Sequence, residues 1–186
     1  MPLAVAQLGQ PILRAAAEPV PLDEIGTPEF RQLLSDMKET MLAARGAGLA
    51  APQVFVSRRV FLARIVPPDP EQPDAPPPVE VFINPRIVAV TEAVESAWEG
   101  CLSFPELLVL VPRRRGIRVE YLDVQGRLLS AELHGYPARV VQHETDHLDG
   151  ILTIDRAAST RDIIKASEMA AMLGKQGAAP VDPGPE

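Results

Sequence analysis

The segment best suited to chemistry is His143-Glu144-Thr145-Asp146-His147, a HExxH pattern inside a predicted helix. Residues i and i+4 of a helix lie one above the other, about 5.4 Å apart, so two imidazoles can bind the same metal ion. Glu144 is rotated by about 100° from His143, so we expect it to face a water molecule at the ion and act as a base. The pattern predicts a metal-dependent hydrolase, and a chance match on a solvated helix face is the alternative.

A catalytic metal site needs a third protein ligand and one open position. The metzincin pattern would place its last histidine at Thr153, so that pattern is excluded. Glu168 lies 21 residues after His147 on a predicted second helix, which suits a thermolysin-like metallopeptidase. Cys101 offers a soft thiolate instead, although a lone cysteine is usually a small buried hydrophobe. The residues by themselves leave Cys101 and Glu168 both open.

A run of small residues, Gly46-Ala47-Gly48-Leu49-Ala50-Ala51-Pro52-Gln53, directly follows a predicted helix. Its glycines and alanines make a slim segment that allows another backbone or a ligand to lie against it. Gln53 adds an amide donor at its end. A tightly packed turn under a sheet would explain the same composition.

Three segments together, GAGLAAPQ (46–53), EGCLS (99–103) and HETDH (143–147), resemble peptide deformylase in their order and approximate spacing. The resemblance extends from near the N-terminus to about residue 170. It implies an α+β fold in which antiparallel β-sheets surround a central HExxH helix, with an N-terminal helix and a C-terminal helix. It also implies a hydrolase that removes the N-formyl group from N-formylmethionyl nascent peptides and releases formate.

The resemblance assigns a role to each matching residue. It implies that Cys101, His143 and His147 bind the metal, that Glu144 is the catalytic acid and base, and that the Gln53 amide and the Leu102 N–H stabilise the oxyanion. It further implies that the Gly48 backbone meets the substrate, and that four residues flank the methionine pocket: Glu99, Tyr136, Arg139 and Val140.

The resemblance implies one divalent metal ion per chain, with Fe²⁺ in the cell and Zn²⁺, Ni²⁺ or Co²⁺ as replacements after purification. The implied partners are N-formylmethionyl peptides, met as nascent chains at the ribosome. Leu108 departs from the family, because many members carry a basic residue there. The segment 161–186 has three basic and four acidic residues, so we do not expect it to dock on the ribosome as a basic helix.

Two other interpretations remain as alternatives to the deformylase. The first is a thermolysin-like metallopeptidase with Glu168 as the third ligand. The second is a non-enzymatic domain in which a closed zinc site holds the fold together. Glu144 argues against the second alternative, because a purely structural site has no use for a base beside the metal.

The elements that position these residues follow from the sequence pattern. Thr27-Pro28-Glu29 predicts a helix start, and an apolar stripe from Phe30 to Met41 predicts one buried face, with Gly46 as the stop. Strands are expected over 60–66 and 79–90, and a hairpin over 117–121 and 127–133. Further helices are expected over 137–149 and 159–173. Helices and antiparallel strands in this order indicate an α+β fold.

Length and composition place the chain among ordinary globular proteins. The 186 residues predict a single catalytic domain over 1–173, with a proline-rich surface insertion at 67–78 and a flexible polar tail at 174–186. A net charge of −7 argues against direct DNA binding, so we expect Arg113-Arg114-Arg115 to be a solvated strand end. Neither a membrane segment nor a targeting peptide is recognised, which favours the bacterial cytoplasm.

Overall fold

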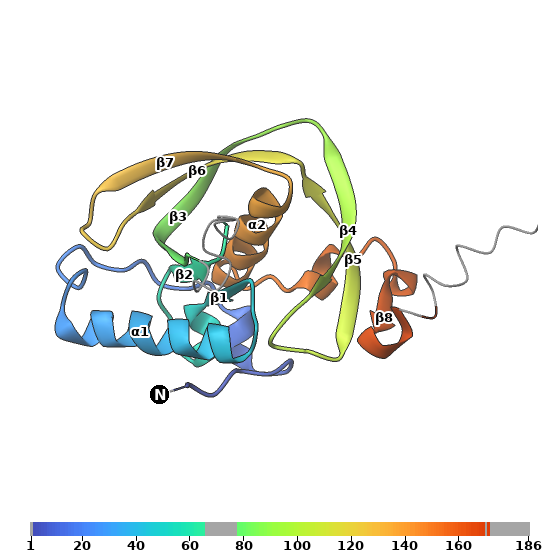
Figure 1. The fold of residues 1–186 in the computed structure, drawn as a ribbon, viewed down its shortest axis with the longest axis horizontal. Helices are drawn as coiled ribbons and strands as arrows, with labels where there is room; N and C mark the ends of the chain where they lie inside the picture. The colour runs from blue at the N-terminus through green and yellow to red at the C-terminus, as the bar shows by residue number, and fades with distance from the viewer. Residues whose placement is uncertain (1, 66–77, 170, 172–186) are drawn as a thin grey trace, which may run out of the picture.

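The computed structural model describes residues 2–65, 78–169 and 171, and in them two antiparallel sheets and two α-helices. The five-stranded sheet has the order β1-β2-β3-β6-β7, and the three-stranded sheet has the order β4-β5-β8 (Figure 1). The strands are β1 Gly48–Ala50, β2 Val60–Ala63, β3 Glu80–Val90, β4 Val94–Gly100, β5 Leu107–Arg114, β6 Gly116–Leu122, β7 Leu128–His134 and β8 Ile163–Lys165. The helices are α1 Pro28–Ala43 and α2 Tyr136–Leu148, with short 3-10 turns η1 Pro11–Arg14, η2 Ala51–Val54, η3 Thr153–Arg156, η4 Thr160–Asp162 and η5 Ala166–Glu168.

Helix α1 starts where the sequence predicts. The Thr27 side chain accepts a hydrogen bond from the Phe30 N–H, and Pro28 occupies the first helical position. The apolar stripe is buried against β1 and β2, where Met37 and Met41 are fully enclosed. The helix ends at Ala43, and the left-handed residue that follows it is Arg45 rather than the predicted Gly46.

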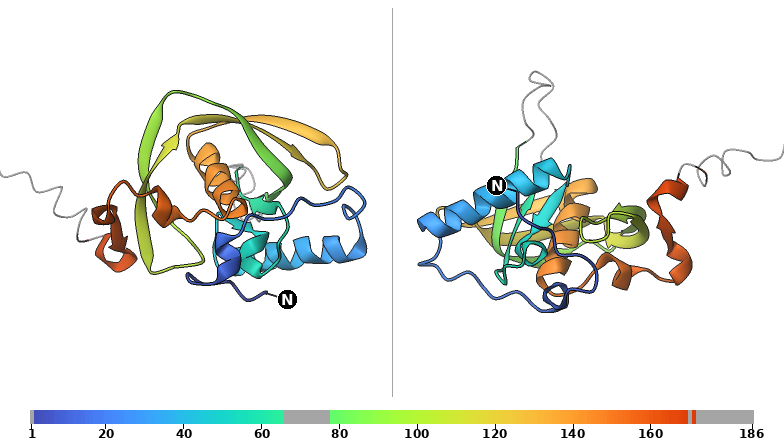
Figure 2. Two further views of the ribbon diagram at one scale, coloured as in Figure 1. Left: turned by 180° about the vertical axis from the view of Figure 1, so that it is seen from behind. Right: turned by 90° about the horizontal axis from the view of Figure 1, so that it is seen from below.

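Helix α2 carries the HExxH residues and contacts strands of both sheets: β1, β2 and β7 of the larger one and β5 of the smaller one. In the views of Figures 1 and 2, α2 lies in the space that the two sheets enclose. Its apolar side packs on an aromatic cluster in which Phe82 stacks between Phe61 and Tyr121. Its other side is thereby left facing the segment that contains Cys101.

The strand predictions are confirmed in their essentials. Segments 60–63 and 80–90 form β2 and β3, and the predicted hairpin forms β6 and β7 in unbroken register from Gly116↔His134 to Leu122↔Leu128. Asp123 stabilises the hairpin turn, because its Oδ1 accepts hydrogen bonds from the backbone N–H groups of Gln125 and Arg127. Gly126 supplies the positive φ of this turn.

The helix predicted over 159–173 is wrong from Ser159 to Glu168. Residues 163–165 form β8 there, which pairs with β5 at Leu107–Val109, and single 3-10 turns lie on either side. Two adjacent β-branched residues, Ile163 and Ile164, favour a strand over a helix once a partner strand is available. Of the remaining predicted residues, Met169 and Ala171 are helical, and 170, 172 and 173 lie outside the described residues.

The insertion predicted at 67–78 lies outside the described residues except for Pro78, and the tail predicted at 174–186 lies wholly outside them. The single domain over 1–173 stays a prediction. Within the described ranges, neither α-helix combines the length and the apolar composition needed to cross a membrane.

Candidate metal centre and active site

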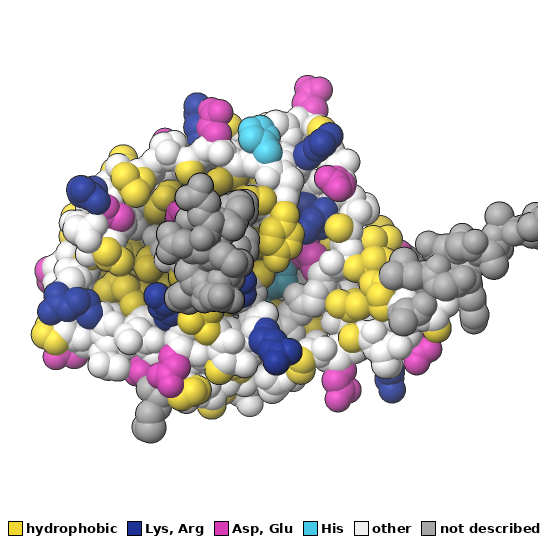
Figure 3. Space-filling view, in the orientation of Figure 1, with side chains coloured by type: hydrophobic (Ala, Val, Ile, Leu, Met, Phe, Trp, Pro, Cys, Tyr) yellow, Lys and Arg dark blue, Asp and Glu magenta, His cyan; other side chains and the backbone are white. Residues whose placement is uncertain are grey.

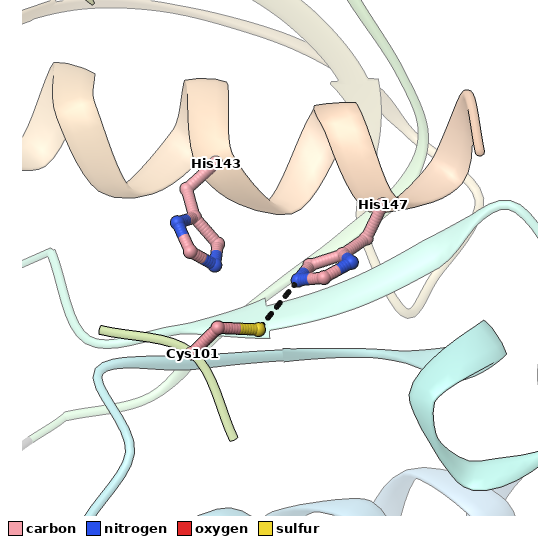
Figure 4. A group of neighbouring side chains, drawn as sticks. All are labelled: Cys101, His143 and His147. Atoms are coloured by element: carbon pink, nitrogen blue, oxygen red, sulfur yellow. Dashed lines mark hydrogen bonds between the residues drawn. The ribbon is translucent and has the colours of Figure 1, made fainter. Parts of the chain in front are cut away.

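Helix α2 and the segment after β4 bring together three side chains that could hold a metal ion. His143 and His147 project from the same face of α2 toward Cys101, which directly follows Gly100 at the end of β4 (Figure 4). One ligand atom from each of the three residues lies within 4.8 Å of the other two, and the Cys101 Sγ is 3.3 Å from the His147 Nε2. The structure therefore assembles one sulfur and two nitrogen donors around a common point.

This donor set fits a borderline-soft divalent ion such as Zn²⁺ or Fe²⁺. The Nδ1 of His147 is buried without a hydrogen-bond partner among the described residues, as is the Oε2 of Glu144. Burial, together with the positive charges of His143 and Arg113, lowers the pKa of His147 well below its usual value. His147 is thus held as the neutral imidazole, the form that binds metals.

His143 is oriented by a buried carboxylate. Its Nδ1 lies 2.9 Å from the Oε2 of Glu99, which leaves its Nε2 for the metal. Arg113 forms a two-pronged ion pair with the same carboxylate at 2.9 and 3.0 Å, and Arg139 contacts it at 2.7 Å. Burial would raise the pKa of Glu99, but hydrogen bonds and charges from His143 and Arg113 outweigh it and lower this pKa to about 2. Glu99 is therefore a permanent anion behind His143.

Arg113 connects the Glu99 carboxylate to a second carboxylate, that of Asp146 on α2. Its Nη1 is 2.5 Å from the Oδ2 of Asp146, and Arg156 contacts the Oδ1 of Asp146 at 2.6 Å. The prediction of a solvated strand end is wrong for Arg113, which is only 5% exposed, because two carboxylates from distant segments neutralise it. Sequence reasoning missed Arg113, Asp146 and Arg156 as supports of the site. No signal in the sequence pointed to them, because no strand is predicted over 107–114 and the burial of Arg113 depends on the packing of β5.

Glu144 lies beside the candidate metal ligands and against the backbone of β1. A Cβ on Gly48 would sit 2.5 Å from the Glu144 Cδ, which is closer than real Cβ atoms approach. Glycine is therefore required at position 48 for the Glu144 carboxylate to occupy this place. Burial raises the pKa of Glu144 to about 7, even though the charge of His143 opposes the rise. A carboxyl group with such a pKa can take up and release a proton near neutral pH.

Gln53 is held in place beside Cys101 by two hydrogen bonds. Its Oε1 accepts a hydrogen bond from the Ala50 N–H at 2.9 Å, which determines the orientation of the amide. Its Nε2 donates to the Ser103 Oγ at 3.1 Å and is 3.6 Å from the Cys101 Sγ. The buried amide donor thus lies directly beside Cys101, one of the candidate metal ligands.

The first residues of the chain connect the segments that carry Gln53 and Leu102. The Ala6 N–H donates to the carbonyl of Gln53 at 2.7 Å, and the Leu8 N–H donates to the carbonyl of Ser103 at 2.9 Å. The Gln7 side chain donates to the carbonyl of Leu102 at 3.2 Å. Residues 6–8 therefore hold both predicted oxyanion-stabilising segments in place.

A cavity of about 370 Å³ opens over the cluster. Figure 3 shows this face hollowed between the sheets, with basic, acidic and histidine side chains gathered in the hollow. All five residues predicted to bind substrate line the cavity, as do the two predicted oxyanion donors: Gly48, Glu99, Tyr136, Arg139, Val140, Gln53 and Leu102. Among the five, Glu99 and Arg139 are engaged with each other, so their side chains also serve to build the cavity wall.

Glu168 does not join the site. It lies exposed on η5, next to β8, and the group of possible metal ligands found in the described residues contains Cys101 instead. The thermolysin-like arrangement, which needs Glu168 at the metal, is therefore not favoured. Leu108 lies on β5 and packs against Gly100.

Comparisons with known proteins agree with this geometry. The family model described as Polypeptide deformylase matches residues 2–162. Peptide deformylase 1 of Nitrosomonas europaea is 47% identical over 149 residues, which are 80% of this chain and 83% of that protein. Peptide deformylase 2 of Nostoc sp. is 41% identical over 174 residues, which are 93% of this chain and 96% of that protein.

Solved structures show the same similarity in three dimensions. The Met-Ala-Ser-bound crystal structure of class I type b peptide deformylase from Acinetobacter baumannii matches with a TM-score of 0.76 and 41% identity, covering 84% of this chain and 98% of that one. Peptide deformylase from Thermotoga maritima matches with a TM-score of 0.75 and 39% identity, covering 86% and 99%. The chain belongs to the polypeptide deformylase family, the hydrolases that remove the N-formyl group from nascent peptides.

Proposed function

We propose that this chain deformylates N-formylmethionyl peptides at one divalent metal ion bound by Cys101, His143 and His147. The observation that carries the proposal is the convergence of these three ligand atoms within 4.8 Å, with a buried Glu144 of raised pKa beside them. In this proposal α2 is the central catalytic helix of the fold, because it supplies both histidines and the base.

The chemistry of the bound ion is that of a Lewis acid, which makes a water molecule more acidic and polarises the formyl oxygen. Glu144 accepts the proton of the attacking water at its carboxylate and then delivers it to the leaving amine nitrogen. Gln53 and the Leu102 N–H donate hydrogen bonds to the formyl oxygen as negative charge develops there, and one such donor is typically worth about 3 kcal/mol. The peptide product leaves with a free amino group, and the formyl group leaves as formate.

The cavity wall orients the substrate. The Gly48 backbone lies against Glu144 and is available to the peptide backbone, while Tyr136, Arg139, Val140 and Glu99 flank the methionine side chain. These contacts place the formyl carbon near the base, and correct placement of reacting groups is worth several orders of magnitude in rate.

We propose Fe²⁺ as the working metal, with Zn²⁺, Ni²⁺ or Co²⁺ as substitutes. A site with one thiolate and two imidazoles accepts all four ions, so availability in the cell decides which one is present. We expect protein purified in air to lose turnover within days, and full activity under those conditions without a reductant or a substitute metal would contradict the assignment of iron. Nascent chains at the ribosome, in a bacterial cytoplasm, are the proposed source of substrate, and the bacterial origin of the relatives supports this setting.

Formate release from formyl-Met-Ala-Ser by anaerobically purified, iron- or nickel-loaded protein tests the function. We expect turnover by the wild type and a loss of about 10²-fold to 10⁴-fold in Glu144→Gln, because the variant lacks the base. Equal turnover by both proteins would contradict the proposed role of Glu144.

A second experiment tests the ligand set by zinc titration against a chromophoric chelator. Cys101→Ser is expected to weaken zinc binding strongly, because the thiolate is replaced by a poor ligand. Glu168→Gln is the matched control and is expected to leave the affinity unchanged, because Glu168 is exposed and outside the site. The opposite result would restore the thermolysin-like arrangement.

A further inference from the structure

Arg45 adopts a backbone conformation that normally belongs to glycine. The end of α1 is closed by two hydrogen bonds, from the Arg45 N–H to the Leu42 carbonyl at 3.0 Å and from the Gly46 N–H to the Met41 carbonyl at 2.8 Å. In this type of helix end the residue with positive φ is usually glycine, because a Cβ is strained there. Arg45 occupies that position with a φ of 56°. Because this backbone conformation disfavours arginine, its presence indicates that the arginine side chain has a role outside the helix end.

Arg45 also lines the active-site cavity. It precedes by three residues Gly48, whose backbone abuts the Glu144 carboxylate. Three extended residues span at most about 10 Å, and a bound peptide in extended form covers the same distance in about three residues. Arg45 is therefore within reach of the second and third side chains of a peptide whose formyl group lies at Glu144.

The positively charged side chain of Arg45 is exposed and accessible to an anion. Arg139, the other arginine that lines the cavity, is occupied by the Glu99 carboxylate and by the carbonyls of Val111 and Glu95. Within the described part of the chain, no hydrogen bond or ion pair engages the Arg45 side chain. The cavity lining thus contains one arginine that has no ion-pair partner among the described residues.

We infer that Arg45 is a specificity-determining residue that favours formylated peptides with an acidic side chain at the second or third position. This inference rests on the proposed deformylase function. The ion pair would form in contact with water, so the preference is modest and sensitive to salt. We expect a Glu peptide to exceed a Lys peptide by about 3-fold to 10-fold in kcat/KM, expressed mainly in KM.

The experiment compares amidated peptides, so that the substrate carboxyl terminus does not contribute charge. Glu, Gln or Lys is placed at the third position of formyl-Met-Ala-X-amide and at the second position of formyl-Met-X-Ala-amide. For the wild type we expect Glu above Gln above Lys at one of the two positions at least, with the differences disappearing in about 0.5 M NaCl. Arg45→Lys should keep the order, Arg45→Gly should remove it, and Arg45→Glu should invert it.

Arg118→Gln is the matched control. It removes one exposed positive charge on β6, outside the cavity, and should leave the order of the peptides unchanged. Arg45→Gly should also raise the melting temperature by about 2–4 °C, because glycine relieves the strain at this φ. This measurement is independent of activity and shows that the variant is folded.

The possible outcomes distinguish a failure of the Arg45 inference from a failure of the proposed deformylase function. If the wild type releases no formate from the neutral Gln peptides, the proposed function fails. If it turns over all peptides and the Glu-to-Lys ratio is the same in the wild type, Arg45→Gly and Arg45→Glu, the function stands and the role of Arg45 is overturned.

Discussion

Replacing Arg113 by methionine tests how the buried ion pairs support the metal site. Methionine keeps most of the side-chain volume but leaves Glu99 and Asp146 with fewer positive partners. Removing one partner of a buried ion pair costs about 3–5 kcal/mol. Glu99 retains Arg139 and His143, and Asp146 retains Arg156, so we expect the lower end, about 3 kcal/mol of unfolding free energy.

The same substitution should weaken metal binding, because Glu99 orients His143 from behind. Loss of a partner of a metal-binding histidine typically costs about 10-fold to 100-fold in metal affinity. Arg113 acts on Glu99 rather than on His143 itself, so we expect about 10-fold. Urea unfolding of the metal-free protein measures the stability, and zinc competition with a chromophoric chelator measures the affinity.

Arg114→Met is the matched control, since Arg114 is exposed and binds the backbone carbonyls of Thr91 and Glu92. We expect it to change stability by less than about 0.5 kcal/mol and to leave the zinc affinity unaltered. The double variant Arg113→Met/Glu99→Gln should lose less than the sum of the two single changes, because the two residues interact. A loss below about 1 kcal/mol in Arg113→Met with unaltered zinc affinity would refute the reasoning.

Three further predictions concern Glu144 and its contact with β1. Gly48→Ala should lower kcat by about 100-fold with little change in zinc affinity, because the new Cβ displaces the Glu144 carboxyl group. An unchanged kcat would contradict the close contact between Gly48 and Glu144. The plot of kcat/KM against pH should fall at acid pH with an apparent pKa no higher than about 7. Burial raises the pKa of Glu144 to about 7, and a bound cation lowers it again. An acid limb centred above pH 8 would exclude Glu144 as the base. In the presence of a chelator, the unfolding free energy of the wild type relative to Glu144→Gln should fall by about 3 kcal/mol as the pH rises from 4.5 to 7. The reason is that the folded state holds the Glu144 proton more tightly than the unfolded chain does. Urea unfolding at both pH values checks this, and a rise in relative stability would contradict it.

The site could be predicted from the sequence where its residues are set by local spacing. The two histidines and Glu144 follow from helical periodicity alone, and α1 follows from its cap at Thr27 and its apolar stripe. The choice of Cys101 over Glu168 did not follow from spacing, since it depends on how β4 and α2 pack. It came from the family resemblance, and the structure places Cys101 at the histidines.

The parts that sequence reasoning missed depend on contacts between distant segments. In the sequence, Arg113 is one of three consecutive arginines that are expected to be exposed. Only the packing of β5 against α2 shows that Glu99 and Asp146 neutralise it. The strand β8 forms because the edge of β5 offers hydrogen bonds to a segment more than 50 residues later in the chain. Local propensity favoured a helix there, and tertiary pairing decided the outcome.

The hydrogen bonds of residues 6–8 to Gln53, Leu102 and Ser103 have a practical consequence for protein production. A truncation or a bulky fusion close to residues 6–8 would disturb hydrogen bonds that hold the two proposed oxyanion donors, although residues 6–8 are remote from α2 in the sequence. Such a protein could keep its core, bind zinc and still turn over poorly. The effect of a tag at the N-terminus is therefore best measured by comparing activity before and after the tag is removed.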